Sequence, residues 1–427
     1  MKFKFRERRK KYSKLKDNDL FPDITKKKCK LSCGFNITII FIILLEFFLI
    51  IYYYFNLKKI NADIKNNNIV IDSVDNTLNL SAIPREESLN LAKQYLNICQ
   101  SGALINNKTF QDYKNPIFSV VIPVYNSQKS IKRAVRSIQN QNLLNLEIIL
   151  VNDIPSDNTT KIIEEMQKED PRIKIIYNQK NMGTLYSRSI GALQARGKYI
   201  TTIDNDDLFS NRYILSFIFN ETENQFFDII SFRAFFFQGT RCGDDFLTSK
   251  NDRQHLKHFQ PQLGIYAIEN RNPIKPNHIL IWGKAVRNEV YKSALNLVGK
   301  ERFSNLIIWA EDTSMYFVIS NVADSYKYIN VYGIIHFSYS RSSSIVLPST
   351  EKRMGDIYLL DMVIDFSKNE YKKLAAYGLL SSGGVYDRLK SEKVIISLKS
   401  LLNKIINCDY IDDNLKNQVR QKFNQFL

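Results

Sequence analysis

Short apolar runs alternate with amphipathic stretches between residues 117 and 204. Four apolar runs predict buried strands at 117–125, 146–153, 172–178 and 198–204. The stretches between them predict helices at 127–141, 158–170 and 183–197, the first with Ile131, Val135 and Ile138 on one face. Strands and helices that alternate at this spacing are joined by right-handed crossovers. The pattern therefore predicts an α/β fold, a mostly parallel sheet flanked by helices on both faces.

One apolar run is much longer than the others. Residues 35–55, FNITIIFIILLEFFLIIYYYF, contain a single charged residue, Glu46, and are long enough to cross a bilayer as a helix. Residues 1–34 carry 13 Lys or Arg and 4 Asp or Glu, so the positive-inside bias keeps this basic arm in the cytosol. We predict a single-pass type II membrane protein of the Golgi or ER membrane, with its large C-terminal part in the lumen. A buried core helix and the opposite topology are the alternatives.

The rest of the chain divides by its texture. Residues 56–114 are polar and rich in Asn, which predicts a stem, with one helix near residues 86–98. Residues 115–345 hold the alternating pattern and predict the catalytic domain. Residues 346–427 predict a helical C-terminal extension, for example at 394–406, and contain no residues of a catalytic type.

The net charge of +17 suggests a nucleic-acid protein, but its distribution argues against one. More than half of the excess lies in the basic arm, and no nucleic-acid-binding motif accompanies it. We therefore expect a lipid bilayer as a partner, through residues 35–55, and no nucleic acid.

Cysteines and glycosylation sequons bear on the compartment. Beyond the predicted span lie Cys99, Cys242 and Cys408, an odd number that permits at most one disulfide. Sequons, which fit a lumenal glycoprotein, start at Asn79, Asn107, Asn158 and Asn220.

Polar side chains follow three of the predicted strands at the point where each strand ends. Tyr125 and Asn126 follow the first strand, Asp153 ends the second, and the acidic segment 204–207, DNDD, follows the fourth. The carboxyl ends of parallel strands meet at one edge of a sheet, where ligands bind. One such segment is explained by a solvated turn, whereas three together favour a site.

The acidic segment is suited to a divalent cation. Asp204 and Asp206 can supply carboxylate oxygens to Mg²⁺ or Mn²⁺ and leave other positions for water and a diphosphate. The chain has no glycine-rich dinucleotide fingerprint and no P-loop. Phosphate binding would therefore depend on metal and side chains.

An ordered series of motifs resembles the inverting family 2 glycosyltransferases with the GT-A fold. The series is PVYN at 123–126, VND with SDNT at 151–159, SRSIGALQARGKYI at 187–200 and DNDD at 204–207. Looser similarity continues through IWGKAVR, WAEDTSMYF and HFSYSRSSSI, between residues 281 and 345. The resemblance implies a GT-A nucleotide-sugar-binding fold. It also implies transfer of a sugar, with inversion, from a nucleotide-diphosphate sugar to the hydroxyl of a glycan, glycoprotein or glycolipid, and a UDP-sugar is the expected donor.

The resemblance assigns nucleotide-binding roles at the first two strand ends. Pro123 and Tyr125 resemble the positions that pack on the nucleotide base, and Asp153 resembles the carboxylate that hydrogen-bonds it. Asn152 departs from the family pattern, which more often has a second acid there, so the choice of base is open.

Three further residues correspond to family positions around the diphosphate. Arg188 resembles the family arginine near the nucleotide, although Ser189 replaces the usual Asn after it; an exposed helix residue is the structural alternative. Asp204 resembles the residue that contacts nucleotide and metal, and Asp206 the principal metal ligand. Asp207 either joins them or caps the segment that follows.

Inversion requires a general base on the face of the sugar opposite the leaving diphosphate. The family pattern places this base in an acidic pair, here Glu311 and Asp312, and we choose Asp312. Carboxylates that only stabilise a helix N-terminus are the alternative.

Four other residues are weaker candidates. Trp282 and Lys284 resemble acceptor-side or core positions, and His336 and Arg341 are within reach of the diphosphate if the resemblance holds. For Trp282, core packing is an equally good interpretation, and His336 at the end of an apolar strand is more often structural.

Two other functions compete with glycosyl transfer. A nucleotidyltransferase would need a Gly-rich, Arg-containing loop after the first strand, where this chain has PVYNSQKS. A catalytically degenerate, membrane-anchored nucleotide-sugar-binding or scaffold subunit is suggested by Asn152 and Ser189. The acids retained at Asp153, Asp204, Asp206 and Asp312 argue against that version.

Overall fold

The computed structural model describes residues 79–105, 110–222, 226–238, 241–243, 281–303, 307, 310–337, 349–367, 369, 372–381 and 391–427. The described residues all belong to one compact unit, Leu78–Leu427. The predicted basic arm, the predicted span at 35–55 and the start of the predicted stem lie outside the described residues. Within the described residues, none of the helices has the length and apolar character needed to cross a bilayer.

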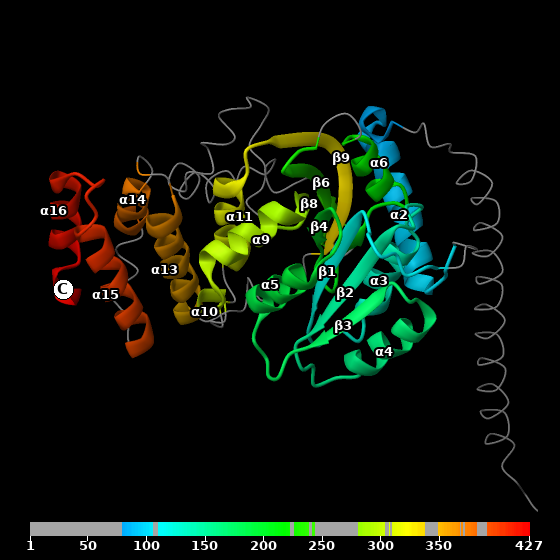
Figure 1. Ribbon diagram of the computed structural model, residues 1–427, viewed down its shortest axis with the longest axis horizontal. Coiled ribbons are helices and arrows are strands. Elements are labelled where there is room, and N and C mark those ends of the chain that lie inside the picture. The colour runs from blue at the N-terminus through cyan, green and yellow to red at the C-terminus, as the bar shows by residue number, and fades with distance from the viewer. Residues whose placement is uncertain are drawn as a thin grey trace, which may run out of the picture. The chain divides into compact units, whose positions relative to one another are not determined.

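The first half of this compact unit alternates strands and helices (Figure 1). Its elements are the 3₁₀ helix Leu80–Ala82, α2 (Arg85–Ser101), β1 (Phe118–Val124), α3 (Ile131–Gln139), β2 (Leu146–Asn152), α4 (Thr159–Glu169), β3 (Ile173–Tyr177), α5 (Thr184–Gln194), β4 (Tyr199–Thr202), β5 (Leu208–Phe209) and α6 (Ile214–Asn220). The four strands and three helices that the hydrophobic pattern predicts between 117 and 204 are confirmed, with ends that differ by a few residues.

In the described residues, the second half adds further strands, with three helices before the last of them, and then ends in helices. Its elements are β6 (Ile229–Gln238), β7 (Arg241–Gly243), β8 (Lys284–Arg287), α9 (Asn288–Val298), α10 (Lys300–Phe303), α11 (Glu311–Val322), β9 (Tyr326–Phe337), α13 (Ser349–Phe366), α14 (Lys373–Ser381), α15 (Glu392–Ile406), α16 (Asp413–Lys422) and the 3₁₀ helix Asn424–Phe426. The described part of the predicted C-terminal extension is therefore helical.

The strands form one nine-stranded sheet in the order β3-β2-β1-β4-β8-β6-β9-β5, with β7 beside β6. β3, β2, β1 and β4 are parallel, as predicted. β8 pairs antiparallel with both β4 and β6, and β5 pairs antiparallel with β9. The sheet is therefore mixed, and the prediction of a mostly parallel sheet was wrong for the second half. β6 and β9 are parallel, and helices α9, α10 and α11 lie in the connection that leads to β9. The regular alternation of one strand with one helix, which supplies the crossovers of a parallel sheet, stops after β4, because β5 follows β4 without a helix.

Alternating residues of the central strands face two different cores. Val121, Ile149 and Val151 face the side covered by α5, α9 and α11. Val120, Ile122 and Leu150 belong to the core that includes α3, α4 and α6. Because side chains alternate across a strand, strands that are apolar throughout require a helical layer on each face, and Figure 1 shows these two layers.

Helix α2, predicted within the stem, packs against the folded domain. Tyr95 and Cys99 are buried in a third core together with Phe235 and Ile335. The Tyr95 hydroxyl donates a 2.8 Å hydrogen bond to the carbonyl of Ser137 in α3. Residues 85–101 are therefore part of the compact unit.

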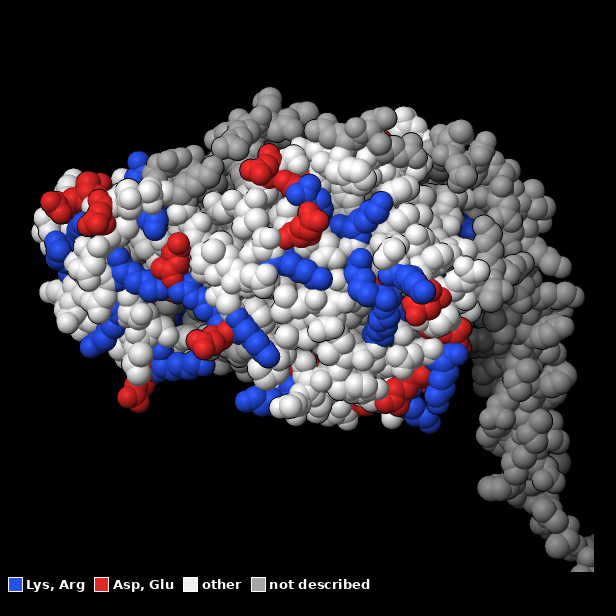
Figure 2. Space-filling view, in the orientation of Figure 1, with Lys and Arg blue, Asp and Glu red and all other residues white. Residues whose placement is uncertain are grey.

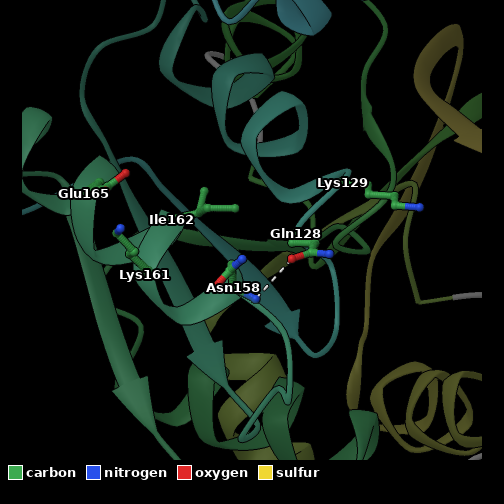
Figure 3. A pocket seen from close by; sticks show the side chains of 6 residues that line it. All are labelled: Gln128, Lys129, Asn158, Lys161, Ile162 and Glu165. Carbon is green, nitrogen blue, oxygen red and sulfur yellow. Dashed lines mark hydrogen bonds between the residues drawn. The ribbon is translucent and has the colours of Figure 1, made fainter.

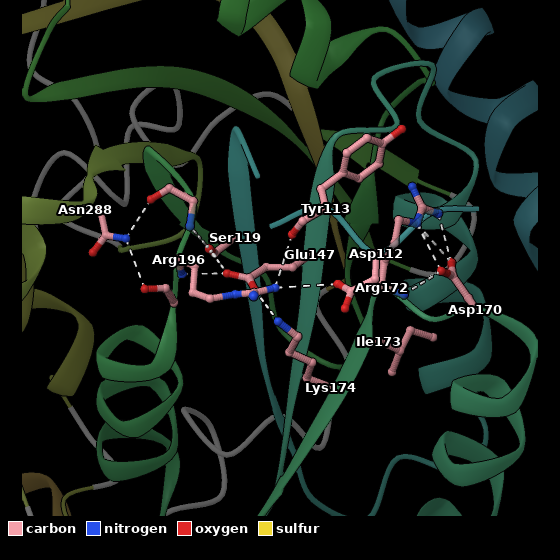
Figure 4. Close-up of polar contacts among 12 residues, drawn as sticks. Asp112, Tyr113, Ser119, Glu147, Asp170, Arg172, Ile173, Lys174, Arg196 and Asn288 are labelled. Carbon is pink, nitrogen blue, oxygen red and sulfur yellow. Dashed lines mark hydrogen bonds and ion pairs between the residues drawn. The ribbon is translucent and has the colours of Figure 1, made fainter. Parts of the chain in front are cut away.

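A buried carboxylate ties the start of the sheet to the turn after α5 (Figure 4). Glu147 accepts hydrogen bonds from the Ser119 hydroxyl at 2.6 Å, the Arg196 backbone N–H at 2.6 Å and Lys174 Nζ at 2.9 Å. Burial alone would raise the pKa of Glu147, but these donors lower it below its usual value. The network is structural, because it lies at the amino ends of the strands, opposite the predicted site.

Ion pairs also join the C-terminal helices to the domain. Lys404 in α15 lies 2.6 Å from Asp361 and 2.7 Å from Asp365 of α13, and Arg302 of α10 pairs with the same two acids. On the face shown in Figure 2, basic and acidic side chains are interspersed over the described surface.

Close packing of α5 on the sheet gives a stability prediction. A Cβ added to Gly191 would lie 2.4 Å from Val121 Cγ1 and 3.0 Å from Val151 Cγ2, both in strands that cannot easily move. We expect Gly191→Ala to reduce the free energy of unfolding by about 1–3 kcal/mol through overpacking. Urea denaturation of residues 79–427 measures this change. Gln194→Ala, on the exposed side of the same helix, is the control and should have little effect; equal stability of the two variants would contradict the packing analysis.

Candidate active site

The acidic loop lies directly after β4, at the carboxyl edge of the parallel strands. Asp204 and Asp206 are half-buried, and Asp207 is fully buried. Two contacts hold this loop to its surroundings. Arg133 of α3 donates a 2.7 Å hydrogen bond to the Asp206 carbonyl, and Asn205 Nδ2 donates one of 3.1 Å to the Tyr125 carbonyl. The ends of β1 and β4 are thereby joined.

Arg188 is the centre of the carboxylate arrangement. Its guanidinium lies 2.5 Å from Asp204 Oδ1, pairs closely with Asp312 and lies 3.7 Å from Glu311 Oε1. Only 5% of Arg188 is exposed. Burial opposes its charge, but Asp204 and Glu311 raise the pKa of the guanidinium above its ordinary value. We call Arg188, Asp204, Glu311 and Asp312 the Arg188 cluster; it excludes the exposed-helix alternative for Arg188.

The position of Arg188 follows from how α5 begins and packs. Asp153, at the end of β2, accepts hydrogen bonds from the backbone N–H groups of Met182 at 2.7 Å and Gly183 at 2.8 Å. These bonds fix the turn before α5, where Gly183 has a φ of 84°. Gly191 then lets the helix lie directly on β1 and β2. Arg188, one turn before Gly191, is held at the carboxyl edge as a result.

The predicted base-binding residues lie at the same edge. Pro123 is buried in β1, and the Tyr125 side chain is 45% exposed just beyond that strand. Asp153 is buried, and Asn178 Nδ2 donates a further 2.7 Å hydrogen bond to it. An exposed aromatic ring and a carboxylate at the ends of adjacent strands suit contact with a planar base. Asp153 in addition has the structural role that its backbone contacts define.

The two departures from the family pattern have local structural roles. Asn152 Nδ2 donates to the Thr160 hydroxyl at 2.9 Å, and Asn152 Oδ1 accepts from the Ile154 N–H at 3.0 Å. The Ser189 hydroxyl donates to the Leu185 carbonyl one turn earlier in α5. Asn152 thus stabilises Ile154 in its left-handed conformation, with a φ of 57°, which branched residues rarely adopt.

Asp207 forms a second charged pair, with His336 of β9. Asp207 Oδ2 lies 2.7 Å from His336 Nδ1, and Asp207 Oδ1 accepts a 3.0 Å bond from the Phe337 N–H. The His336 ring stacks on Trp282, with ring centres 4.9 Å apart. Burial lowers the pKa of His336, but Asp207 raises it overall to about 9. Asp207 therefore connects the acidic loop to β9, and Trp282, 3% exposed, is a core residue beside the site.

The crowding of acids changes the protonation of Asp206. Burial, followed by the charges of Asp207 and Asp204, raises the pKa of Asp206 to about 7. Burial likewise raises the pKa of Glu311, although Arg188 offsets part of this effect. A group of carboxylates this costly to ionise is typical of a place where a cation binds.

The donor set fits a divalent cation. Asp204, Asp207 and His336 each offer a ligand atom within 4.8 Å of the others, and Asp206 is in the same loop. Carboxylate oxygens suit divalent cations such as Mg²⁺ and Mn²⁺, and one imidazole can complete such a donor set. This group contains the predicted Asp204 but not Asp206, the predicted principal ligand, and it adds Asp207 and His336, which the sequence ranked lower. The position of His336 at the end of a strand was a signal in the sequence. Its pairing with Asp207 could not be predicted, because that contact depends on the order of the strands in the sheet.

Some predicted residues are not brought to the site or not described. Lys284 is buried in β8, with its Nζ 4.3 Å from the centre of the Tyr316 ring. Arg341 and residues 244–280 lie outside the described residues, and so does the sequon at Asn107. Among the described cysteine side chains, Cys99 and Cys408 are free thiols.

A surface pocket of about 450 Å³ lies near the loops after β1 and β2 (Figure 3). Its lining is Gln128, Lys129, Asn158, Lys161, Ile162 and Glu165. The lining contains none of the predicted site residues. The candidate catalytic and metal-binding carboxylates therefore lie outside this pocket.

The fold and the site define an α/β protein with a GT-A-like mixed sheet and flanking helices. Acidic side chains lie at the carboxyl ends of its parallel strands. Residues 119–241 match the family described as Glycosyl transferase family 2. These residues include the first three predicted motifs and the acidic loop, and the match supports a glycosyltransferase.

Curated relatives support the same class. The Bacillus subtilis (strain 168) "Uncharacterized glycosyltransferase EpsJ" is 31% identical over 207 residues, 46% of this chain and 54% of EpsJ. A Campylobacter jejuni "GalNAc(5)-diNAcBac-PP-undecaprenol beta-1,3-glucosyltransferase" is 40% identical over 93 residues, 22% of this chain and 30% of that protein. The Streptococcus pneumoniae "Glycosyltransferase GlyG" is 28% identical over 186 residues, 42% of this chain and 60% of GlyG. The chain thus spans less than two thirds of the length of these relatives.

A solved structure supports the fold. The structure of S. aureus TarS 1–349 in complex with UDP-GlcNAc has a TM-score of 0.50 and 17% identity, covering 72% of this chain and 88% of TarS 1–349. At this identity the similarity concerns the fold alone.

The raised pKa of Asp206 predicts pH-dependent metal binding. Below about pH 7 the free protein holds a proton on Asp206, and this proton must leave before the carboxylate binds Mn²⁺. We expect the Mn²⁺ affinity of the wild type, relative to that of Asp206→Asn, to fall by about tenfold per pH unit below that pH, because the proton of His336, whose pKa is about 9, affects both proteins alike. Titration calorimetry with Mn²⁺ at a series of pH values measures the effect. Asp206→Asn is the reference protein; a ratio of the two affinities that is flat from about pH 8 to about pH 6 would contradict the prediction.

Proposed function

We propose that this protein is a glycosyltransferase that moves a sugar from a nucleotide-diphosphate sugar, with a UDP-sugar as the donor, to an acceptor hydroxyl with inversion. The observation that carries the proposal is the Arg188 cluster. It joins Asp204, at the end of β4, to the acidic pair at the start of α11. A carboxylate suited to metal and diphosphate and a carboxylate suited to a base thus face each other across one side chain.

The nucleotide would lie at the carboxyl ends of β1 and β2. The exposed Tyr125 ring offers a face for the base, with Pro123 beneath the same strand end. Asp153 borders this place and at the same time fixes the turn that carries α5. The diphosphate would then extend toward Asp204 and the acidic loop.

Asp312 is the proposed general base. It is the second residue of α11, where the helix N-terminus favours a negative charge. Its carboxylate also pairs with Arg188, which holds it in place. Inversion needs a single displacement, so the base takes the proton of the acceptor hydroxyl on the face opposite the leaving diphosphate. Glu311, beside it, is farther from Arg188, and burial raises the pKa of Glu311.

Asp204 and Asp206, with Asp207 and His336 beside them, are the residues that would hold Mn²⁺ or Mg²⁺. When bound, the cation would offset the charge that develops on the leaving diphosphate. Asp207 and His336 also keep the acidic loop joined to β9.

Removal of single carboxylates tests this assignment. Residues 79–427 are incubated with a panel of nucleotide sugars and candidate acceptors, and nucleoside diphosphate release is measured with Mn²⁺ or EDTA. We expect Asp312→Asn to lower kcat, measured at saturating Mn²⁺ and donor, by at least about 10²-fold, as for loss of a general base. Asp206→Ala should weaken metal and donor binding together. Asp409→Asn, on the exposed C-terminal surface, is the matched control and should keep full activity.

Two results would count against the proposal. Activity that persists in EDTA and in Asp206→Ala would remove the role of the metal. Donor binding without turnover by the wild type, over the whole acceptor panel, would favour the non-catalytic nucleotide-sugar-binding subunit.

We also propose that residues 35–55 hold the protein in a membrane as a single-pass type II anchor. The length and apolar character of the segment and the basic arm before it support this. A lumenal Golgi or ER location follows from the charge bias. The bacterial origin of the relatives favours the second candidate, a catalytic domain on the cytosolic face.

Expression of the full chain in a eukaryotic cell distinguishes the two topologies. A type II orientation should resist alkaline extraction and add glycans at the exposed Asn79, Asn158 and Asn220, which a glycosidase then removes. Deletion of residues 35–55 should release the protein into the soluble fraction. A membrane-bound but unglycosylated protein would support the cytosolic face, and an extractable full chain would exclude the anchor.

A further inference from the structure

Arg188 contacts acids that come from two distant parts of the chain. Asp204 ends a strand of the parallel half of the sheet, whereas Glu311 and Asp312 begin α11. Nη2 of Arg188 faces Asp204, and Nη1 faces the acidic pair. Nε is buried and has no hydrogen-bond partner among the residues that the structure describes. The two terminal nitrogens thus form the link between the two sides.

We propose that Arg188 is a positioning residue that couples the metal side of the site to the base side, by competing with the divalent cation for Asp204 while it holds Asp312. This inference rests on the proposed function, because it gives Asp204 and Asp312 the roles stated above. It differs from the nucleotide contact that the resemblance implies for this arginine.

The competition follows from charge and burial. A guanidinium 2.5 Å from a carboxylate oxygen occupies one side of that carboxylate and places a positive charge beside any cation bound to it. Because Arg188 is almost completely buried, water screens this repulsion poorly. A cation that binds Asp204 therefore weakens the hold of Arg188 on Asp204. The guanidinium then pairs with Asp312 and Glu311 alone. A cation bound at Asp204 therefore strengthens the contact that orients Asp312, the proposed base.

The coupling predicts that loss of Arg188 strengthens metal binding. We expect Arg188→Met to bind Mn²⁺ about tenfold more tightly than the wild type, since a competing buried positive charge is gone. The same variant should have a lower kcat, because the base is no longer held. A residue with only a structural role would weaken binding and activity together. A residue that only binds nucleotide would leave the affinity for Mn²⁺ alone unchanged.

The experiment is a double-mutant cycle on Mn²⁺ affinity, measured by calorimetry without nucleotide in residues 79–427. Its members are the wild type, Arg188→Met, Asp312→Asn and the double variant. When Arg188 is present, Asp312→Asn leaves its guanidinium to pair more closely with Asp204. This substitution should therefore weaken Mn²⁺ binding about threefold to tenfold. In the Arg188→Met background the same substitution should have almost no effect, because the link is missing. A simple loss of negative charge would instead weaken binding equally in both backgrounds.

Two controls keep the result interpretable. Arg196→Met removes an arginine that pairs with the buried Glu147 at the opposite end of the strands, and it should leave Mn²⁺ affinity unchanged. Arg188→Lys keeps the charge but has one nitrogen instead of a fork. If Arg188→Met does not fold, as judged by circular dichroism, the lysine variant takes its place in the cycle, and the effect of Asp312→Asn should be at least halved.

The outcomes separate this inference from the proposed function. Unchanged or weaker Mn²⁺ binding in folded Arg188→Met, equal effects of Asp312→Asn in both backgrounds, or no Mn²⁺ binding by the wild type each overturn the coupling. Wild-type turnover of a nucleotide sugar is measured separately. Turnover without coupling would support the proposed function and overturn this inference. Coupling without any turnover would overturn the proposed function and support the link between the two sides.

Discussion

The buried positive charge of Arg188 is the interaction on which the arrangement of the site depends. Acids from the loop after β4 and from the start of α11 lie close together because this guanidinium lies between them. Without a cation of some kind, their mutual repulsion would push the loop and the helix apart. Charge neutrality at this edge is therefore a structural condition as well as a chemical one.

The scaffold delivers Arg188 to that place through ordinary packing. Gly191 lets α5 lie on β1 and β2 without a side chain in between, and Asp153 fixes the turn before the helix. On the far side of the loop, Asp207 holds His336 and the backbone of Phe337. The acidic loop is thus held from α5, α3 and β9 at once. A loop that is held on several sides can keep carboxylates close together before any ligand binds.

The C-terminal helices belong to the same argument. α11, which begins with Glu311 and Asp312, packs in one core with α13 and α15. The ion pairs of Arg302 and Lys404 with Asp361 and Asp365 join α10, α13 and α15. These helices contain none of the candidate catalytic residues, but they support the helix on which the proposed base lies.

The sequence by itself determined the strands and helices of the parallel half and the acidic positions at the strand ends, Asp153, Asp204 and Asp206. It could do so because hydrophobic periodicity and the residues that end an element are local features of the sequence. The sequence also predicted parallel strands where the second half of the sheet is mixed. The order and direction in which β8 and β9 join the sheet cannot be predicted from local patterns. Only the tertiary structure decided that Arg188 and Asp312, 124 positions apart, form a pair, and that Asp207 meets His336. Contacts of this kind depend on which strands become neighbours and on the total burial of charge, and both are properties of the whole fold.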